Sequence, residues 1–264
     1  MKTTRLCAIA LGAAMMLGST GGALAMTVDG FAPDVGDFVT AGDRKWGPGP
    51  VGTGATISYS FMNAGISMAG DAAASNTTDL ANLLGNLNAF KNMMRSAFDA
   101  WEAVANLTFV EVADSGNAFD TPGAAGDIRI GAHSFDGPSN VLAHAYFPPP
   151  NGNSAAGDLH FDSDDLWELV SDGTGDGVFN IFQVAMHEIG HSIGLNHTNV
   201  PNSLMNAFYS EAFLGPQADD IAGAQYLYGV PVNGNPIPLP AALPLLGGGI
   251  LLMGFVGRRK RRAA

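Results

Sequence analysis

Residues 187–197, His-Glu-Ile-Gly-His-Ser-Ile-Gly-Leu-Asn-His, restrict what this chain can fold into more than any other stretch. On a helix, residues four apart share a face, so His187 and His191 can direct their imidazoles at one centre. Glu188 lies beside the first of them, where a carboxylate can accept a proton from an attacking water. Gly194 allows a left-handed helix end, after which the chain can return to deliver His197. Three imidazoles with one open position predict a catalytic zinc; a buried helix of hydrogen-bonded histidines is the alternative.

Charge is distributed unevenly along the chain. Seven of the 12 Lys and Arg residues lie within the first five and the last seven residues, which leaves five against all 24 Asp and Glu in between. Nucleic acid is therefore not an expected partner, because phosphate binding requires a basic face. The surplus of Asp suits oxygen ligation of calcium, although an acidic solvated surface has the same composition.

Residues 1–25 have the layout of a secretory signal peptide, with a basic start, an apolar run from Leu6 to Leu17, and Ala23-Leu24-Ala25 before the cut. The single cysteine, Cys7, lies inside this segment. Cleavage would leave a protein without cysteine, so we expect packing and bound metals, not disulfides, to stabilise it.

The pattern of apolar residues predicts alternating strands and helices between an irregular segment at 26–55 and a Pro- and Asn-rich linker at 231–240. Residues 63–78 are small and polar, which indicates a loop or an insertion. The expected strands are Thr56–Phe61, Leu107–Val112, Asp127–Ile130, Val141–Tyr146 and Asp158–Phe161, and the expected helices are Leu80–Ala105, Val178–Ile193 and Asp219–Tyr228.

The three other histidines, His133, His144 and His160, lie on or beside the short strands in the middle of the chain. A lone strand histidine is usually a hydrogen-bonded core residue, but three on neighbouring strands indicate a second, structural zinc. Carboxylates crowd around them and favour calcium. These are Asp127, Asp136, Asp158, Asp162, Asp164 and Asp165.

Met205, eight positions after His197, completes a resemblance to the metzincins and, at that spacing, to the matrixins, the matrix metalloproteinases and their bacterial relatives. The resemblance extends over Asp43–Gly229 and implies a catalytic domain at 43–230 after an N-terminal segment at 26–42. It implies an α+β, zincin-like fold: a twisted, mainly parallel five-stranded sheet, three helices and an active site in a cleft below an edge strand. The matching motifs are Lys45-Trp46, 135–138 (Phe-Asp-Gly-Pro), 142–146 (Leu-Ala-His-Ala-Tyr), 157–162 (Gly-Asp-Leu-His-Phe-Asp) and 219–221 (Asp-Asp-Ile).

The resemblance also implies a role for individual residues. Glu188 is the general base, and Val141–Tyr146 is the sheet edge on which a substrate peptide pairs. The ligands that it implies are His187, His191 and His197 for the catalytic zinc, His133, His144 and His160 for the structural zinc, Asp136, Asp162 and Asp165 with the carbonyls of Gly137, Ser139 and Val141 for one calcium, and Asp127 and Asp158 with loop carbonyls for a second.

The chain departs from the matrixin pattern after His133. Matrixins usually place an Asp two positions after this histidine, whereas Ser134 and Phe135 follow here in a shortened loop. The fourth ligand is then a shared Asp136 or a water, or the site is weaker. After signal cleavage no cysteine remains for a cysteine-based latency device, so any latency would need another ligand, for which Asp29, Asp34 and Asp37 are candidates.

The C-terminus resembles a second known signal. Ile237-Pro238-Leu239-Pro240-Ala241, an apolar run to Val256 and the basic residues 258–262 are similar to PEP-CTERM sorting tails, which exosortase-type enzymes of Gram-negative bacteria process. A plain membrane anchor at 241–264 is the alternative, although the apolar run is shorter than the ~20 residues of a usual spanning helix. This resemblance implies export to the cell surface or beyond, with transient anchoring in the membrane.

Together these features predict an exported, monomeric zinc endopeptidase with protein or peptide substrates. A competing hypothesis is a calcium- and zinc-stabilised surface or biofilm-matrix protein with little catalysis. Zinc-dependent hydrolysis of another substrate class is a third. An intact Glu188 disfavours the second hypothesis, and an edge strand suited to peptides disfavours the third.

Overall fold

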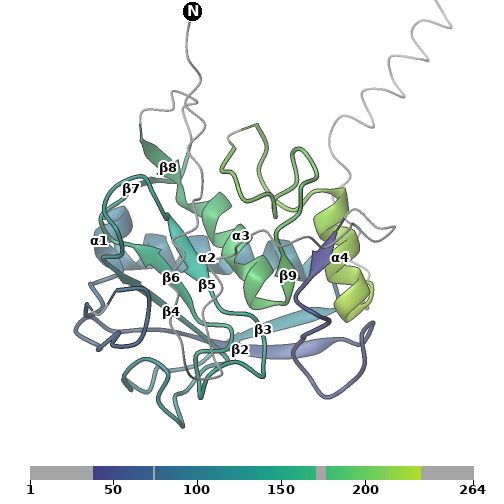
Figure 1. Cartoon of the computed structure of the whole chain (residues 1–264), viewed down its shortest axis with the longest axis horizontal. Helices are drawn as coiled ribbons and strands as arrows, with labels where there is room; N and C mark the ends of the chain where they lie inside the picture. Colours follow the sequence, from purple (N-terminus) through teal and green to yellow (C-terminus); the bar gives the residue numbers. More distant parts are fainter. Residues whose placement is uncertain (1–37, 74, 171–176, 211, 233–264) are drawn as a thin grey trace, which may run out of the picture. The chain divides into compact units, whose positions relative to one another are not determined.

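A five-stranded sheet carries His133, His144 and His160. The computed structural model describes residues 38–73, 75–170, 177–210 and 212–232, of which 38–231 belong to one compact unit (Figure 1). The sheet order is β3-β2-β4-β6-β5; the first four strands run parallel, and β5 pairs antiparallel with β6 at one edge. The strands are β2 Ala55–Phe61, β3 Leu107–Glu111, β4 Ile128–His133, β5 Ala143–Ala145 and β6 Leu159–Asp162. The predicted fold class and the mainly parallel sheet are confirmed.

The two-residue period of a strand sorts these side chains between the two faces of the sheet. In β4 and β6, the apolar residues Ile128, Ile130 and Phe161 belong to the main core. The intervening residues, among them His133 and His160, lie on the opposite face and are equally buried. One face is therefore packing surface, and the other carries polar groups beneath covering loops.

Four helices are present in the described part of the chain, one more than predicted. The single helix expected over Leu80–Ala105 is wrong: Gly85 adopts φ 68° and separates α1 (Ala81–Leu84) from α2 (Leu87–Glu102). Asn86 then caps α2 by accepting hydrogen bonds from the N–H groups of Asn88 and Ala89 at 2.8 and 3.1 Å. The apolar period continues across the break and conceals it.

The helix with the histidine motif, α3 (Ile181–Ser192), packs against α2 and against β5 and β6. The indole of Trp101 on α2 donates a hydrogen bond to the carbonyl of Met186 at 3.0 Å. α3 begins three residues later than predicted, because residues 178–180 form strand β8, paired with β7 (Leu166–Glu168). Asn180 ends this strand and caps the helix.

The last helix, α4 (Ala218–Tyr228), ends at Gly229 with φ 81°, as predicted. The segment expected to be irregular contains a short strand, β1 (Val39–Thr40), which pairs antiparallel with β9 (Leu195–Asn196). Strands of two or three residues are set by their partners and leave almost no periodic pattern in the sequence.

The predicted signal peptide at 1–25, most of the linker at 231–240 and the tail at 241–264 lie outside the described residues. Among the residues that are described, no helix is both long and apolar enough to cross a membrane.

Candidate metal centres

Three histidines converge where the motif predicts. The Nε2 atom of His197 lies 3.1 Å from Nε2 of His187 and 3.1 Å from Nε2 of His191. A tetrahedral zinc with bonds of about 2.0–2.1 Å would place its ligand atoms about 3.3 Å apart, so small outward shifts would make room for the ion. His187 and His191 are buried, whereas His197 is partly exposed, which leaves one side accessible to solvent.

Backbone carbonyls fix the orientation of two of these rings. Nδ1 of His187 lies 2.6 Å from the carbonyl oxygen of Leu204, and Nδ1 of His191 lies 2.9 Å from that of Leu195. A proton on each Nδ1 satisfies these contacts and leaves the lone pair of Nε2 directed at the centre. Burial also lowers the pKa of all three imidazoles, that of His197 to about 3, so they are neutral, as zinc ligands must be.

Glu188 is the acidic group next to this centre. The residue is 1% exposed, and its Oε2 atom is buried without a hydrogen-bond partner among the described residues. Burial raises the pKa of its carboxyl to about 8. A nearby cation would favour the charged form again, so this carboxylate fits a site that contains a metal.

Two glycines of the motif are required by close packing. A Cβ on Gly190 would lie 2.4 Å from Sδ of Met205, the residue of the predicted methionine turn. Gly194 has φ +104°, and a Cβ there would lie 2.2 Å from the carbonyl oxygen of Arg44. The first glycine admits the methionine turn, and the second allows the helix to end, as the sequence predicts.

Asp220, on α4, organises the methionine turn. Its buried carboxylate accepts hydrogen bonds from the hydroxyl of Ser203 at 2.6 Å and from the N–H groups of Leu204 and Met205 at 2.8 and 3.0 Å. The carbonyl of Leu204 in turn contacts His187. The sequence alone marks Asp219-Asp220-Ile221 as a motif that matches matrixins and assigns it no role.

The second histidine group also forms. In the register, His144 pairs with His160, and Gly131 lies on the other side of His160. His133, two residues along β4, shares the face of Gly131, so all three rings meet on the side of the sheet away from the main core. Nε2 of His144 lies 3.1 Å from Nδ1 of His160.

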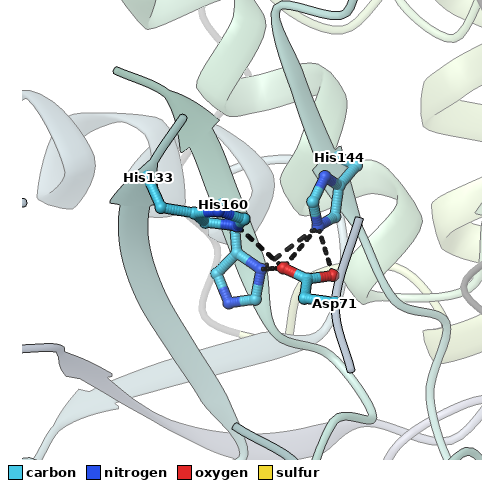
Figure 2. Close-up of side chains that lie close together, drawn as sticks. All are labelled: Asp71, His133, His144 and His160. Carbon is cyan, nitrogen blue, oxygen red and sulfur yellow. Dashed lines mark hydrogen bonds and ion pairs between the residues drawn. The ribbon is translucent and has the colours of Figure 1, made fainter. Parts of the chain in front are cut away.

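A residue that sequence reasoning missed completes this group. Asp71 lies among the three histidines, and its carboxylate is within hydrogen-bond distance of each (Figure 2). Asp136 is not part of the group and instead lies 3.4 Å from the N–H of Val141. Nothing in the local sequence distinguishes Asp71, because the segment 63–78 has the composition of an ordinary loop.

The family model for matrixins matches residues 76–229, more than half of the chain. The chain belongs to the matrixin family. It is 38% identical to karilysin of Tannerella forsythia over 151 residues, which are 54% of this chain and 29% of that protein. It is 39% identical to the macrophage metalloelastase of Oryctolagus cuniculus over 158 residues (56% and 30%), and 40% identical to matrix metalloproteinase-16 of Homo sapiens over 165 residues (57% and 25%).

The matrixin domain of this chain is of the zinc metalloendopeptidase class. The chain spans less than a third of the length of these relatives. Matrixins use a catalytic and a structural zinc together with calcium, and the two histidine groups fit the two zinc ions. Both groups bring imidazole nitrogens to short mutual distances, as zinc ligation requires.

For calcium, this matrixin offers buried carboxylates around the loop 134–141. Asp162 and Asp165 each have one oxygen that is buried and unpartnered among the described residues. Burial, with neighbouring carboxylates as a smaller cause, raises the pKa of Asp165 to about 6. The N–H of Ser139 donates to Asp165 at 2.6 Å, so this loop is already folded around the acids.

The carboxylates of the second predicted calcium site, Asp127 and Asp158, already accept hydrogen bonds from the protein. Asp127 accepts hydrogen bonds from the N–H and the hydroxyl of Ser58 at 2.8 and 2.7 Å. Asp158 accepts one from the N–H of Arg129 at 3.0 Å, and its other oxygen is buried without a partner among the described residues. In the described part of the chain, side-chain ligand atoms of three or more His, Cys, Asp or Glu residues converge within 4.8 Å only in the two histidine groups. The calcium ligands remain a prediction.

Proposed function

We propose that this matrixin is an exported endopeptidase that hydrolyses peptide bonds at the His187–His197 centre. The observation that carries the proposal is the convergence of three neutral imidazoles beside the buried carboxylate of Glu188, one oxygen of which has no partner among the described residues. A purely structural site gains nothing from such a carboxylate, which disfavours the hypothesis of a surface protein with little catalysis.

Glu188 would act as general base and then as general acid. When bound, zinc would supply Lewis-acid activation of water and of the scissile carbonyl. The carboxylate of Glu188 would accept the proton of the attacking water and return it to the leaving amine. The contacts of His187 and His191 with Leu204 and Leu195 would hold the rings in place.

The edge strand β5 would bind the substrate. The N–H of Asp162 donates to the carbonyl of Leu142, and the N–H of Tyr146 donates to the carbonyl of Asp158. Because these groups alternate along an antiparallel strand, the main-chain groups of Ala143 and Ala145 point away from β6. They would pair with an extended peptide, which favours proteins and peptides as substrates.

Replacement of the base tests the proposal. Glu188→Gln should keep the zinc and lower the rate of peptide cleavage by about 10²–10⁴-fold, measured with a quenched fluorescent peptide library. The matched control is Glu168→Gln, on β7, which should cleave like the parent. A zinc chelator should abolish cleavage by the parent protein. Parental activity in Glu188→Gln, or activity that survives chelation, would contradict the assignment.

Export and processing would follow from the two ends of the chain. Residues 1–25 would be removed on export, and an exosortase-type enzyme would process the tail at 241–264. Mass spectrometry of the secreted protein should then find an N-terminus near Met26 and no residue of the tail. An intact Met1 or an intact Ala264 in the exported protein would exclude the corresponding step.

A further inference from the structure

The carboxylate of Asp71 comes from a part of the chain that the family pattern does not assign. The matrixin match begins at residue 76, and Asp71 lies in the loop between β2 and α1. We propose that Asp71 is the fourth ligand of the second zinc, and that this ion fastens the segment 65–77 to the outer face of the sheet. The proposal does not depend on peptidase activity.

The distances around Asp71 fit one metal ion. Its Oδ2 atom lies 2.8 Å from Nε2 of His133 and 2.8 Å from Nδ1 of His160, and its Oδ1 lies 3.0 Å from Nε2 of His144 (Figure 2). A tetrahedral zinc would separate such atoms by about 3.3 Å. The side chain of Asp71 has no exposed surface. Three imidazoles and one carboxylate therefore already surround a point that a zinc ion can occupy after small shifts.

Further hydrogen bonds orient the ligands. The hydroxyl of Tyr146 donates to Oδ1 of Asp71 at 2.6 Å, and the hydroxyl of Ser75 lies 3.0 Å from Nδ1 of His133. The contact of Ser75 leaves Nε2 of His133 free for the metal. Such outer contacts usually accompany metal ligands. Since Ser75 lies in the same segment as Asp71, the segment provides both a ligand and the support of another ligand.

The segment 65–77 folds as a hairpin with Asp71 in its turn. The N–H of Gly65 donates to the carbonyl of Thr77, and the N–H of Met68 donates to that of Ser75. The stem is held by Ile66 and Met68, which join a small apolar cluster separate from the main core. The turn residues 69–73 are Ala, Gly, Asp, Ala and Ala, which bury little apolar surface.

Among the described residues of the turn, Asp71 is the one whose side chain bonds to the sheet. A metal held by Asp71 and His133 closes a long loop of the chain, and such a cross-link restricts the unfolded and partly unfolded states. Removal of the ion should therefore release the tip of the hairpin and leave the core helices intact.

The experiment uses the full chain in a Glu188→Gln background, which excludes self-cleavage. Asp71→Ala is compared with Asp79→Asn, at an exposed acid whose Oδ1 accepts a hydrogen bond from the N–H of Ala81. Metal content is measured by mass spectrometry, and backbone hydrogen exchange is measured over 65–77 and over α2. Asp79→Asn should retain two equivalents of zinc and a protected hairpin. Asp71→Ala should hold the second zinc at least about tenfold more weakly and exchange faster in the hairpin, but not in α2.

If Asp71→Ala does not fold, the proposal can still be tested on the protein that retains Asp71. In the Glu188→Gln protein, stepwise chelation should increase exchange over 65–77 as one zinc leaves, before α2 changes. The proposal is overturned if Asp71→Ala keeps both zinc ions at unchanged affinity, or if the hairpin stays protected after the second zinc has gone. Neither result depends on whether the protein cleaves peptides.

Discussion

The substitution Asp220→Asn tests how the turn beneath the catalytic histidines is held. Oδ1 of Asp220 accepts from Ser203 and Met205, and Oδ2 accepts from the N–H groups of Leu204 and Gln217. The amide of Asn can take two orientations, and the less costly one places its NH₂ group where Oδ1 was. The hydroxyl oxygen of Ser203 can then accept a hydrogen bond from this NH₂ group, whereas the N–H of Met205 faces it as a second donor. One charge-assisted hydrogen bond of about 1.5–3 kcal/mol is lost, and the N–H of Met205 keeps only its contact with the hydroxyl oxygen of Ser203 at 3.1 Å.

The expected cost is therefore about 1.5–3 kcal/mol. For a domain of this size, that corresponds to a fall in melting temperature of roughly 3–12 °C, which calorimetry of the zinc-loaded protein would measure. Because Leu204 also contacts His187, the zinc dissociation constant should rise by about 10–100-fold in a competition titration with a chromogenic chelator. Asp99→Asn, at an exposed position of α2, is the control and should change neither value.

Unchanged stability and unchanged zinc affinity in Asp220→Asn would refute the argument that α4 holds this turn. A fall in melting temperature with unchanged zinc affinity would show that Asp220 stabilises the fold without positioning His187.

Three further predictions concern other parts of the domain. Arg129→Met should destabilise the protein by about 3–5 kcal/mol in urea unfolding, because it leaves the carboxylate of Asp114, the buried partner of Arg129 at 2.8 Å, without its counter-charge. A loss below about 1 kcal/mol would mean that solvent reaches the pair. Gly190→Ala should weaken zinc binding, because the new Cβ displaces Met205, and parental zinc affinity in this variant would show that the methionine is free to move. In EGTA, the free energy of unfolding should fall as the pH rises from about 4 to about 6. The pKa of Asp165 is about 6 in the folded protein and 3.8 ordinarily, so over this range the folded protein retains a proton that the unfolded chain has released. Added calcium should remove this fall, and a stability that is independent of both pH and calcium would count against a calcium site at Asp165.

The catalytic centre was predictable because its geometry is local. His187, Glu188 and His191 lie on one helix, and Gly194 and His197 follow within the next two turns of chain. At such separations, sequence offsets determine positions in space. The sheet was predictable for a related reason: strands of four or more residues, such as β2, alternate clearly enough to be recognised.

Asp71 could not be predicted from the sequence because nothing local marks it. Its distance from His133 is set by how the hairpin 65–77 packs on the sheet, which is a long-range property. The break at Gly85 could not be predicted because the local pattern is misleading. The apolar residues of α1 and α2 keep a common period, and a single glycine within such a pattern is compatible with a continuous helix.

Strand β5 would couple the second metal group to the binding of a substrate peptide. The side chain of His144 belongs to the group around Asp71, while the main chain of Ala143 and Ala145 forms the free edge of the sheet. An ion that steadies this strand lowers the entropy lost when a peptide pairs with it. Linkage is reciprocal, so a bound peptide must tighten the binding of that ion by the same factor. Zinc in the second group would then act as an effector of substrate affinity as well as a brace of the fold.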